Sequence, residues 1–253
     1  MSDWARQASG RPGVGCAGWS LPSSERQRFP PEGSHLERYA AVFPAVEINS
    51  SFHRPHRPAT YARWSASVPP SFRFSVKVPK TITHALRLQR SEGLLETFLA
   101  EARGLGEKTG CFLVQLPPSL GFESAVVEDF FAAFRSRSPV ALACEPRHAS
   151  WFTADADGLL ARLGVARVAA DPARVPAAAE PGGWTGLTYY RLHGSPKMYY
   201  SAYTEEYVEA LAARIHEDAA AGRQIWCIFD NTTLGAATGN ALDLLARLAP
   251  KRA

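Results

Sequence analysis

The sequence predicts an α/β fold: a single (β/α)8 TIM barrel with eight parallel strands and an irregular sixth helix. Eight short apolar segments recur along the 253 residues, helix-like stretches separate most of them, and nearly every segment ends in polar or charged residues. Eight strand-then-helix units in about 250 residues are typical of this barrel, whose active sites lie at the carboxyl ends of the strands. We therefore expect a flexible N-terminal tail over residues 1–12 and one barrel domain over residues 13–253.

The strands are predicted from the short apolar runs. They are Val14–Trp19, Ala45–Asn49, Arg73–Val78, Gly110–Leu116, Val140–Glu145, Ala166–Ala170, Thr188–His193 and Gln224–Asp230. Gly15 and Gly18, in the first run, would permit a close turn into the site. Together with Gly13 they fit G-x-G-x-x-G, but this motif overlaps the strand and a proline-rich segment follows it, so no dinucleotide site is expected.

Capping residues and helical periodicity predict the segments between the strands. Ser34 is expected to cap a helix that ends at Phe43, with Glu37 in the capping-box position, and Thr60 to cap a helix that ends at Val68. The remaining expected helices are Glu92–Lys108, Glu123–Arg137, Asp155–Leu163, Thr204–Ala221 and Asn240–Leu248. The segment Asp171–Gly186 is rich in Pro, Ala and Gly, so a loop is expected in place of a regular sixth helix.

Composition limits the class of protein. Hydrophobic residues make up 46% of the chain, which favours a large core and argues against disorder. No run of 18 apolar residues is present and the first residues lack the apolar region of a secretory signal, so no membrane partner is expected. The four cysteines lie inside expected strands and form no C-x-x-C pair, which favours core thiols in a reducing compartment. We expect a cytoplasmic monomer.

The positive charge is concentrated in one stretch of the sequence. The formal net charge is only +4, but no acidic residue occurs from Ile48 to Ser91. That stretch holds Arg54, Arg57, Arg63, Arg73, Lys77, Lys80, Arg87 and Arg90, with three histidines. It predicts an anion-binding rim at the mouth of the barrel. The alternative is a solvated face that acids elsewhere in the fold balance.

One side of several strands becomes polar toward the carboxyl end. In Arg73–Val78, for example, Phe74 and Val76 share one side, and Ser75 and Lys77 share the other. Barrel interiors normally hold branched apolar residues, and buried charges are costly unless they are paired. We therefore predict a site at the carboxyl ends of the strands. Its strongest members are Glu47, Asn49, Lys77, Gln115, Glu145, Arg147, His193, Asp230 and Asn231.

Roles follow from the residue types. The catalytic candidates are the carboxylates and the histidine: Glu145, His193, Glu47 and Asp230. The substrate-binding candidates are the basic, amide and aromatic residues: Trp19, Asn49, Lys77, Gln115, Arg147, Trp151, Arg191, Tyr199 and Asn231. Aromatic residues of the loops, which also include Phe52, Phe152, Tyr200 and Tyr203, either stack on sugar rings and bases or pack the loops together.

Three acids and a histidine on different strands could hold a divalent cation, as in some sugar isomerases and nucleases of this fold. However, Lys77, Arg147 and Arg191 would share the cavity, and three bases balance three acids. An internal network of ion pairs explains the set without a metal, so we expect no metal and no cofactor. His53 and His56 are also excluded as a metal pair, because arginines flank them.

Seven stretches of the chain resemble a known family. They are Gly15–Ser20, Val46–Phe52, Phe72–His84, Gln115–Pro118, Glu145–Phe152, Tyr190–Gly194 with Tyr199 and Tyr203, and Phe229–Asn231 with Asn240–Leu242. In these stretches the chain resembles domain-of-unknown-function family 72 almost from end to end. The resemblance implies a TIM barrel and no established activity. Departures from the usual pattern are Cys16-Ala17 in place of hydroxyl residues, Leu21 and Pro146 in place of aromatics, and Asp230 in place of Asn.

The leading hypothesis is a hydrolase-like enzyme that acts on an anionic, phosphate-bearing or nucleic-acid-derived substrate, or on a polyhydroxylated one. Lys77, Arg147 and Arg191 would hold the anion, Glu145 or His193 would act as general acid or base, and Glu47 and Asn49 would orient them. The first alternative is a carbohydrate-active hydrolase with paired carboxylates, Glu145 opposite Glu47 or Asp230. The second is a noncatalytic module that binds nucleic acid or a phosphorylated metabolite.

Overall fold

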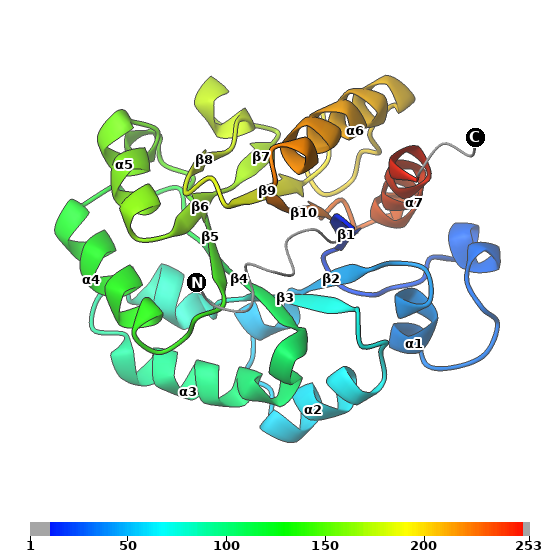
Figure 1. The fold of residues 1–253 in the computed structure, drawn as a ribbon, viewed down its shortest axis with the longest axis horizontal. Helices are drawn as coiled ribbons and strands as arrows, with labels where there is room; N and C mark the ends of the chain where they lie inside the picture. Colours follow the sequence, from blue (N-terminus) through cyan, green and yellow to red (C-terminus); the bar gives the residue numbers. More distant parts are fainter. Residues whose placement is uncertain (1–10, 250–253) are drawn as a thin grey trace.

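The computed structural model describes residues 11–249 and shows an α/β fold in which strands and helices alternate (Figure 1). The strands are β1 Gly13–Cys16, β2 Ala45–Ile48, β3 Arg73–Lys77, β4 Thr109–Gln115, β5 Ala141–Glu145, β6 Val165–Arg167, β7 Ala169–Asp171, β8 Gly182–Gly183, β9 Leu187–Leu192 and β10 Gln224–Phe229. The helices are α1 His35–Ala40, α2 Pro58–Ala66, α3 Glu92–Ala102, α4 Ser124–Arg135, α5 Ala154–Arg162, α6 Glu205–Ala220 and α7 Ala236–Leu248. Residues 1–10 of the expected tail lie outside the described part.

The strands form two sheets, in the orders β1-β10-β9-β7 and β2-β3-β4-β5-β6-β8, and only the short β8 pairs antiparallel. The sheets meet in two places. Ala17 makes a parallel bridge to Glu47 beside β1 and β2. Val168 alone separates β6, which pairs with β5, from β7, which pairs with β9. The parallel pairing places the carboxyl ends of neighbouring strands side by side, and we call this end the mouth.

Most predicted elements are present with small shifts at their ends. The capping box of Ser34 and Glu37 is confirmed. The predicted start of the next helix was wrong, because α2 begins at Pro58 rather than after Thr60. Proline suits the first helical position, since its fixed φ is helical and a backbone N–H at this position would have no partner within the helix. No α-helix follows β7; a short 3-10 turn, Pro176–Ala179, and β8 take its place, as the composition of this segment predicted.

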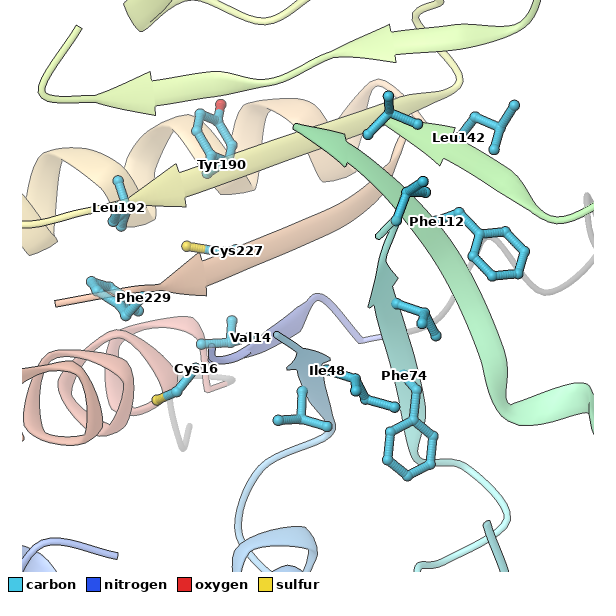
Figure 2. Close-up of a cluster of buried hydrophobic side chains, with 14 of the residues drawn as sticks. Val14, Cys16, Ile48, Phe74, Phe112, Leu142, Tyr190, Leu192, Cys227 and Phe229 are labelled. Atoms are coloured by element: carbon cyan, nitrogen blue, oxygen red, sulfur yellow. The ribbon is translucent and has the colours of Figure 1, made fainter. Parts of the chain in front are cut away.

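The alternation of side chains separates two hydrophobic clusters. The larger lies between the strands and the helices, and Figure 2 shows Phe74, Phe112, Leu142, Tyr190 and Phe229 among its members. The smaller lies on the opposite, inner side of the strands and contains small residues such as Ala45 and Ala143 with Tyr189 and Trp226. The inner residues nearest the mouth are charged, so the predicted polar side of the strands faces inward.

The basic stretch Ile48–Ser91 does not lie on one face of the protein. Lys77 and Lys80 are at the mouth end of β3, but Arg73 begins the same strand and lines a cavity of about 760 Å³ at the opposite, amino end of the strands. Arg63 is exposed on α2. The prediction that the entire stretch forms one rim is therefore wrong, because a strand carries its two ends to opposite ends of the fold.

Candidate functional site

Arg191 lies at the centre of the charged residues on the inner face. It comes from β9 and is completely buried. Its guanidinium reaches three carboxylates from three other strands: Nη2 lies 2.8 Å from Glu47 and 3.0 Å from Asp230, and Nη1 lies 3.1 Å from Glu145. Burial alone would lower the pKa of Arg191, but Asp230, Glu47 and Glu145 outweigh it and raise the pKa well above its usual range. The arginine thus neutralises charge that would otherwise be prohibitive in the interior.

Glu47 is the deepest of the three acids and is completely buried. Both of its oxygens accept hydrogen bonds from Arg191, and Oε2 also accepts one from the hydroxyl of Tyr189 at 2.9 Å. Ser75 lies 3.0 Å from the same hydroxyl. Since Glu47 has no exposed surface, it does not reach a substrate in this structure. In this structure its contacts hold Arg191 and Tyr189, and the catalytic role that the sequence suggested for Glu47 stays a prediction.

His193 follows β9 and bridges the other two acids. Nε2 lies 2.9 Å from Glu145 Oε1, and Nδ1 lies 3.0 Å from Asp230 Oδ2. Donors are also close: Arg147 Nη2 is 3.3 Å from Nε2, and Arg191 Nη1 is 3.5 Å from Nδ1. Each ring nitrogen therefore has a partner whether or not it carries a proton. This is the arrangement that a group passing protons requires.

Glu145 and Asp230 differ in access. The oxygens of Glu145 accept from Arg147 and Arg191 and also face His193, so both are occupied. Asp230 uses Oδ2 for Arg191 and His193, whereas its Oδ1 makes no hydrogen bond to any described residue and is not sealed from solvent. Burial would raise the pKa of both groups, but Arg191 and His193, together with Arg147 at Glu145 and Lys77 at Asp230, outweigh it. The pKa of Asp230 is therefore below its ordinary range, and that of Glu145 is well below it.

Lys77 ends β3 and is the exception in this network, because its residue is only 5% exposed yet its ammonium has no hydrogen bond or ion pair with any described residue. The nitrogen lies 4.2 Å above the ring of Phe52 and is not among the sealed polar atoms. Burial and repulsion by Arg191 lower the pKa of Lys77 to about 8, although Glu47, Asp230 and Glu145 act in the opposite direction. The ammonium therefore reaches solvent but makes no ion pair, and a lysine with a pKa shifted in this way is typical of functional sites.

Arg147 and Tyr199 stand at the outer edge of the network. Arg147 donates to Glu145 at 3.0 and 3.1 Å and keeps 13% of its side chain exposed. Tyr199 is 36% exposed and places its ring edge-on to His193, with ring centres 5.7 Å apart. Its φ of 69° is unusual for a residue with a side chain, and its backbone N–H donates to the carbonyl of His193. The two side chains are the more exposed contacts of the buried His193.

The remaining polar candidates lie at the ends of β2, β4 and β10. Gln115 pairs in register with Glu145 and makes no side-chain hydrogen bond within residues 11–249. Asn231 donates to Ser201 and Asn240, which leaves its Oδ1 buried and without a donor among the described atoms; Asn49 Oδ1 is in the same condition. Buried carbonyl oxygens usually have a partner, so these two are unsatisfied acceptors that are closed to solvent in this structure.

The aromatic candidates have different roles. Trp19 is half-buried and packs edge-on against Trp64 at 5.1 Å, so its role in substrate binding stays a prediction. Trp151 was wrongly assigned to substrate binding: it is completely buried, its Nε1 donates to the carbonyl of Leu120 at 2.9 Å, and its ring packs on Phe122. The loop after β5 turns it into the hydrophobic core instead of toward the mouth.

Replacing Trp151 should test this correction. We expect Trp151→Phe to lower the free energy of unfolding by about 1–3 kcal/mol, because the buried carbonyl of Leu120 loses its donor and the core loses volume. Anion affinity at the mouth should stay unchanged. Chemical denaturation and phosphate titration of the same preparation measure both quantities, and a loss of affinity without a loss of stability would return Trp151 to the site.

No group of three or more His, Cys, Asp or Glu within residues 11–249 is arranged to hold a metal ion. The reason is visible at the centre of the cluster. Glu47, Glu145 and Asp230 would be good ligands, but the guanidinium of Arg191 occupies the point where they converge. The three acids therefore balance a fixed organic cation.

Sequence reasoning missed Tyr189, whose hydroxyl supports Glu47 from inside the ring of strands. The signal was present, because Tyr189 has the same parity as Arg191 and His193 in the run Thr188–His193. A tyrosine in an apolar strand is normally interpreted as a core residue, and only its pairing partner shows its second role.

The fold and the cluster define an α/β protein with a buried network of charges at the carboxyl ends of its parallel strands. Residues 13–253 match the family model described as "Protein of unknown function DUF72", and the chain belongs to this family. It is 32% identical to the "UPF0759 protein YecE" of Escherichia coli K12 over 108 residues. That match covers 43% of this chain and 38% of the relative, so the chain spans well under half of the relative's length.

Solved structures agree on the fold. A DUF72 family protein of Enterococcus faecalis V583 superimposes with a TM-score of 0.77 at 20% identity, covering 94% of this chain and 98% of that one. A DUF72 family protein of Thermotoga maritima MSB8 gives 0.76 at 24% identity, covering 93% and 98%. A xylose isomerase-like TIM barrel/4-hydroxyphenylpyruvate dioxygenase fusion protein gives 0.53 at 16% identity, covering 94% and 42%. The fold is thus TIM-barrel-like. Within residues 11–249, none of the helices has the length and apolar character needed to cross a membrane.

Proposed function

We propose that this protein is an enzyme that binds a small anionic substrate at the mouth, held by Lys77 and Arg147, and moves protons through Asp230 and His193. The proposal takes the two sheets as one barrel of eight strands, in which β6 and β7 are a single interrupted strand. The observation that carries it is Lys77: a largely buried side chain whose ammonium reaches solvent and has no carboxylate partner, next to a network in which every other charge is paired.

The charges around Lys77 favour an anion. His53 and His84 lie near it, and Phe52 contacts both rings at 5.0 Å between centres. Burial lowers the pKa of both histidines; Lys77 and Lys80 lower that of His53 further, and Lys77 and Arg147 that of His84. The cations therefore make the potential at this part of the mouth positive. A phosphate or carboxylate would compensate it, which is the usual function of such unpaired cations.

Proton transfer is assigned to Asp230 and His193 for reasons of access. The free Oδ1 of Asp230 can accept a proton from a substrate, and Oδ2 of the same group faces His193, which continues to Glu145. Glu145 has no oxygen available, so in this proposal it orients His193 and Arg147. Arg191 holds the acids in place from below.

The carbohydrate hydrolase is the weaker candidate. A glycosidase needs a carboxylic acid that is protonated near neutral pH, which requires a raised pKa. The cations around Glu145 instead hold its pKa well below the usual range, and Glu47 is both buried and fully bonded. Asn49 and Asn231 each keep an oxygen without a donor among the described atoms, but both oxygens are closed to solvent in this structure, so they do not decide between the two candidates.

Anion titration tests the proposal. We expect inorganic phosphate and a sugar phosphate to bind the wild-type protein, and the double variant Lys77→Ala/Arg147→Ala to lose affinity by about tenfold or more for the sugar phosphate. Binding should weaken as salt is raised, because the contact is between charges. Isothermal titration calorimetry at low and high salt measures both effects.

The matched control is Arg137→Ala. Arg137 also belongs to an ion pair, with Glu96, but it lies in the turn that follows α4 and should leave affinity unchanged. Melting curves of each variant separate lost binding from lost structure, since Arg147 also contacts Glu145. Equal affinity of the wild-type protein and the folded double variant would contradict the proposal.

A further inference from the structure

Lys77 has a chemical property that anion binding alone does not need. Anion binding by a lysine requires only its positive charge, which the exposed Lys80 three residues later also carries. The side chain of Lys77 is instead largely buried, and its amine rests on the Phe52 ring, reaches solvent and is near enough to Arg191 for the positive charge to act on it. Those surroundings lower the pKa of Lys77 to about 8, so near neutral pH a fraction of this lysine is the free amine, which is a nucleophile.

We infer that Lys77 forms a covalent imine with the carbonyl group of a small aldehyde or ketone that also carries a phosphate or carboxylate. This inference rests on the proposed function, because the anionic part of that substrate is the group that Arg147 would hold. It names the substrate class of the site as an anionic carbonyl compound.

The chemistry balances with the groups present. The lone pair of Nζ adds to the carbonyl carbon, and a proton moves from nitrogen to the former carbonyl oxygen. The second N–H proton is then passed to the same oxygen, which leaves as water while the nitrogen lone pair forms the C=N bond. Amine plus carbonyl thus gives imine plus water, and no oxidant or metal is consumed. The protonated imine withdraws electrons, so a bond at the adjacent carbon can break or form.

The groups for these proton transfers are close to Lys77. The charges of Asp230 and Glu145 are near enough to act on its pKa, and Oδ1 of Asp230 makes no hydrogen bond to a described residue and is not sealed from solvent. His193 lies behind Asp230 and has both a donor and an acceptor for each ring nitrogen. The completely buried Glu47 and Arg191 below them close the floor of the site to water. Exclusion of water favours an imine over hydrolysis.

Reductive trapping tests the inference on the full wild-type chain, so no variant has to fold. The sequence has five lysines, Lys77, Lys80, Lys108, Lys197 and Lys251. The protein is incubated with glycolaldehyde phosphate, glyoxylate or uncharged glycolaldehyde in the presence of cyanoborohydride, and the modified lysine is identified by peptide mass spectrometry. We expect Lys77 to be modified about tenfold faster than Lys80 near pH 7.5, because more of it is free amine.

The three probes distinguish the sources of the anion. Faster labelling of Lys77 by glycolaldehyde phosphate than by glycolaldehyde identifies a phosphate-bearing substrate, and preference for glyoxylate identifies a carboxylate. Inorganic phosphate should slow the labelling by competition. A Lys77→Arg variant should still bind phosphate but show no label at position 77.

The inference would be overturned if Lys77 were labelled no faster than Lys80. It would also be overturned if all three probes labelled Lys77 at the same rate. If phosphate still binds in a manner that depends on Lys77, the proposed anion site stands without it. If phosphate binding is absent as well, the proposed function itself fails.

Discussion

The variant Arg191→Met should lose about 3–5 kcal/mol of its free energy of unfolding at neutral pH, the largest effect that we expect from one substitution in the site. Removing the guanidinium leaves Glu47, Glu145 and Asp230 buried close together without their shared cation. Methionine fills a similar volume, so the loss reports the missing charge rather than a cavity. Chemical denaturation measures it.

The loss should depend on pH in a defined direction. In the wild-type protein the pKa values of Glu145 and Asp230 are lowered, so these groups contribute stability that is present above their unfolded values of about 4 and is lost as the pH falls through the folded values. Without Arg191, burial dominates and raises them instead. Carboxyl groups whose pKa is raised in the folded state stabilise that state at low pH, where they are protonated. This stabilisation is lost as the pH rises through their pKa values in the folded state. The deficit of the variant should therefore be smaller at pH 4.5 than at pH 8.

Two further variants control this result. Arg214→Met removes a partly exposed arginine that pairs with Glu180 and lies over the ring of Tyr190, and we expect it to cost about 1 kcal/mol or less, because methionine can keep the contact with the ring. The double variant Arg191→Met/Glu47→Gln should be more stable than Arg191→Met alone, because one uncompensated charge is gone. An equal loss for Arg191→Met at both pH values, or a loss no larger than that of Arg214→Met, would contradict the role of Arg191 as the shared counter-ion.

The second large effect is expected from Gly15→Ala. A β-carbon at this position in β1 would lie well inside contact distance of the carbonyl oxygen of Ala45 in β2, and 2.8 Å from the hydroxyl of Tyr39. That hydroxyl accepts from the N–H of Cys16 and donates to the carbonyl of Ala45, so it joins β1, β2 and α1. We expect a loss of about 3 kcal/mol or more in the free energy of unfolding, because backbone atoms must move apart.

Gly93→Ala is the matched control. Gly93 lies in α3, and an added β-carbon there meets no atom within 4 Å. Alanine also has a higher helix propensity, so stability should stay unchanged or rise by up to about 1 kcal/mol. If Gly15→Ala is as well tolerated as this control, β1 and β2 are not held in close contact at this point.

Local sequence patterns predicted the elements and the candidate set well. The alternation of residues in Arg73–Val78 and Thr188–His193 correctly placed Lys77 and Arg191 on the inner face, because side-chain direction along a strand has a period of two and needs no knowledge of neighbours. The capping box at Ser34 is equally local. Proline at the start of α2 is also a local signal, and the preference for Thr60 as a cap overlooked it.

Contacts between distant residues could not be predicted in the same way. Trp151 and Tyr199 both follow strands, but the path of each loop turns one into the core and leaves the other half-exposed beside His193. Likewise, the sequence gives three acids and three bases whose formal charges cancel. Only their positions show that Arg191 forms ion pairs with all three acids, whereas Lys77 forms none with the described residues.

The sequence by itself therefore determined which side of each strand a residue occupies and which residues stand at the carboxyl ends, since both follow from backbone geometry within one segment. The tertiary structure alone decided which charged side chains pair with one another. It buries Glu47 against Arg191, leaves one oxygen of Asp230 without a hydrogen bond to a described residue, and leaves Lys77 without a counter-ion among them. Pairing depends on distances of a few ångströms between strands far apart in the chain, and both the Coulomb energy and the cost of burial change steeply over such distances.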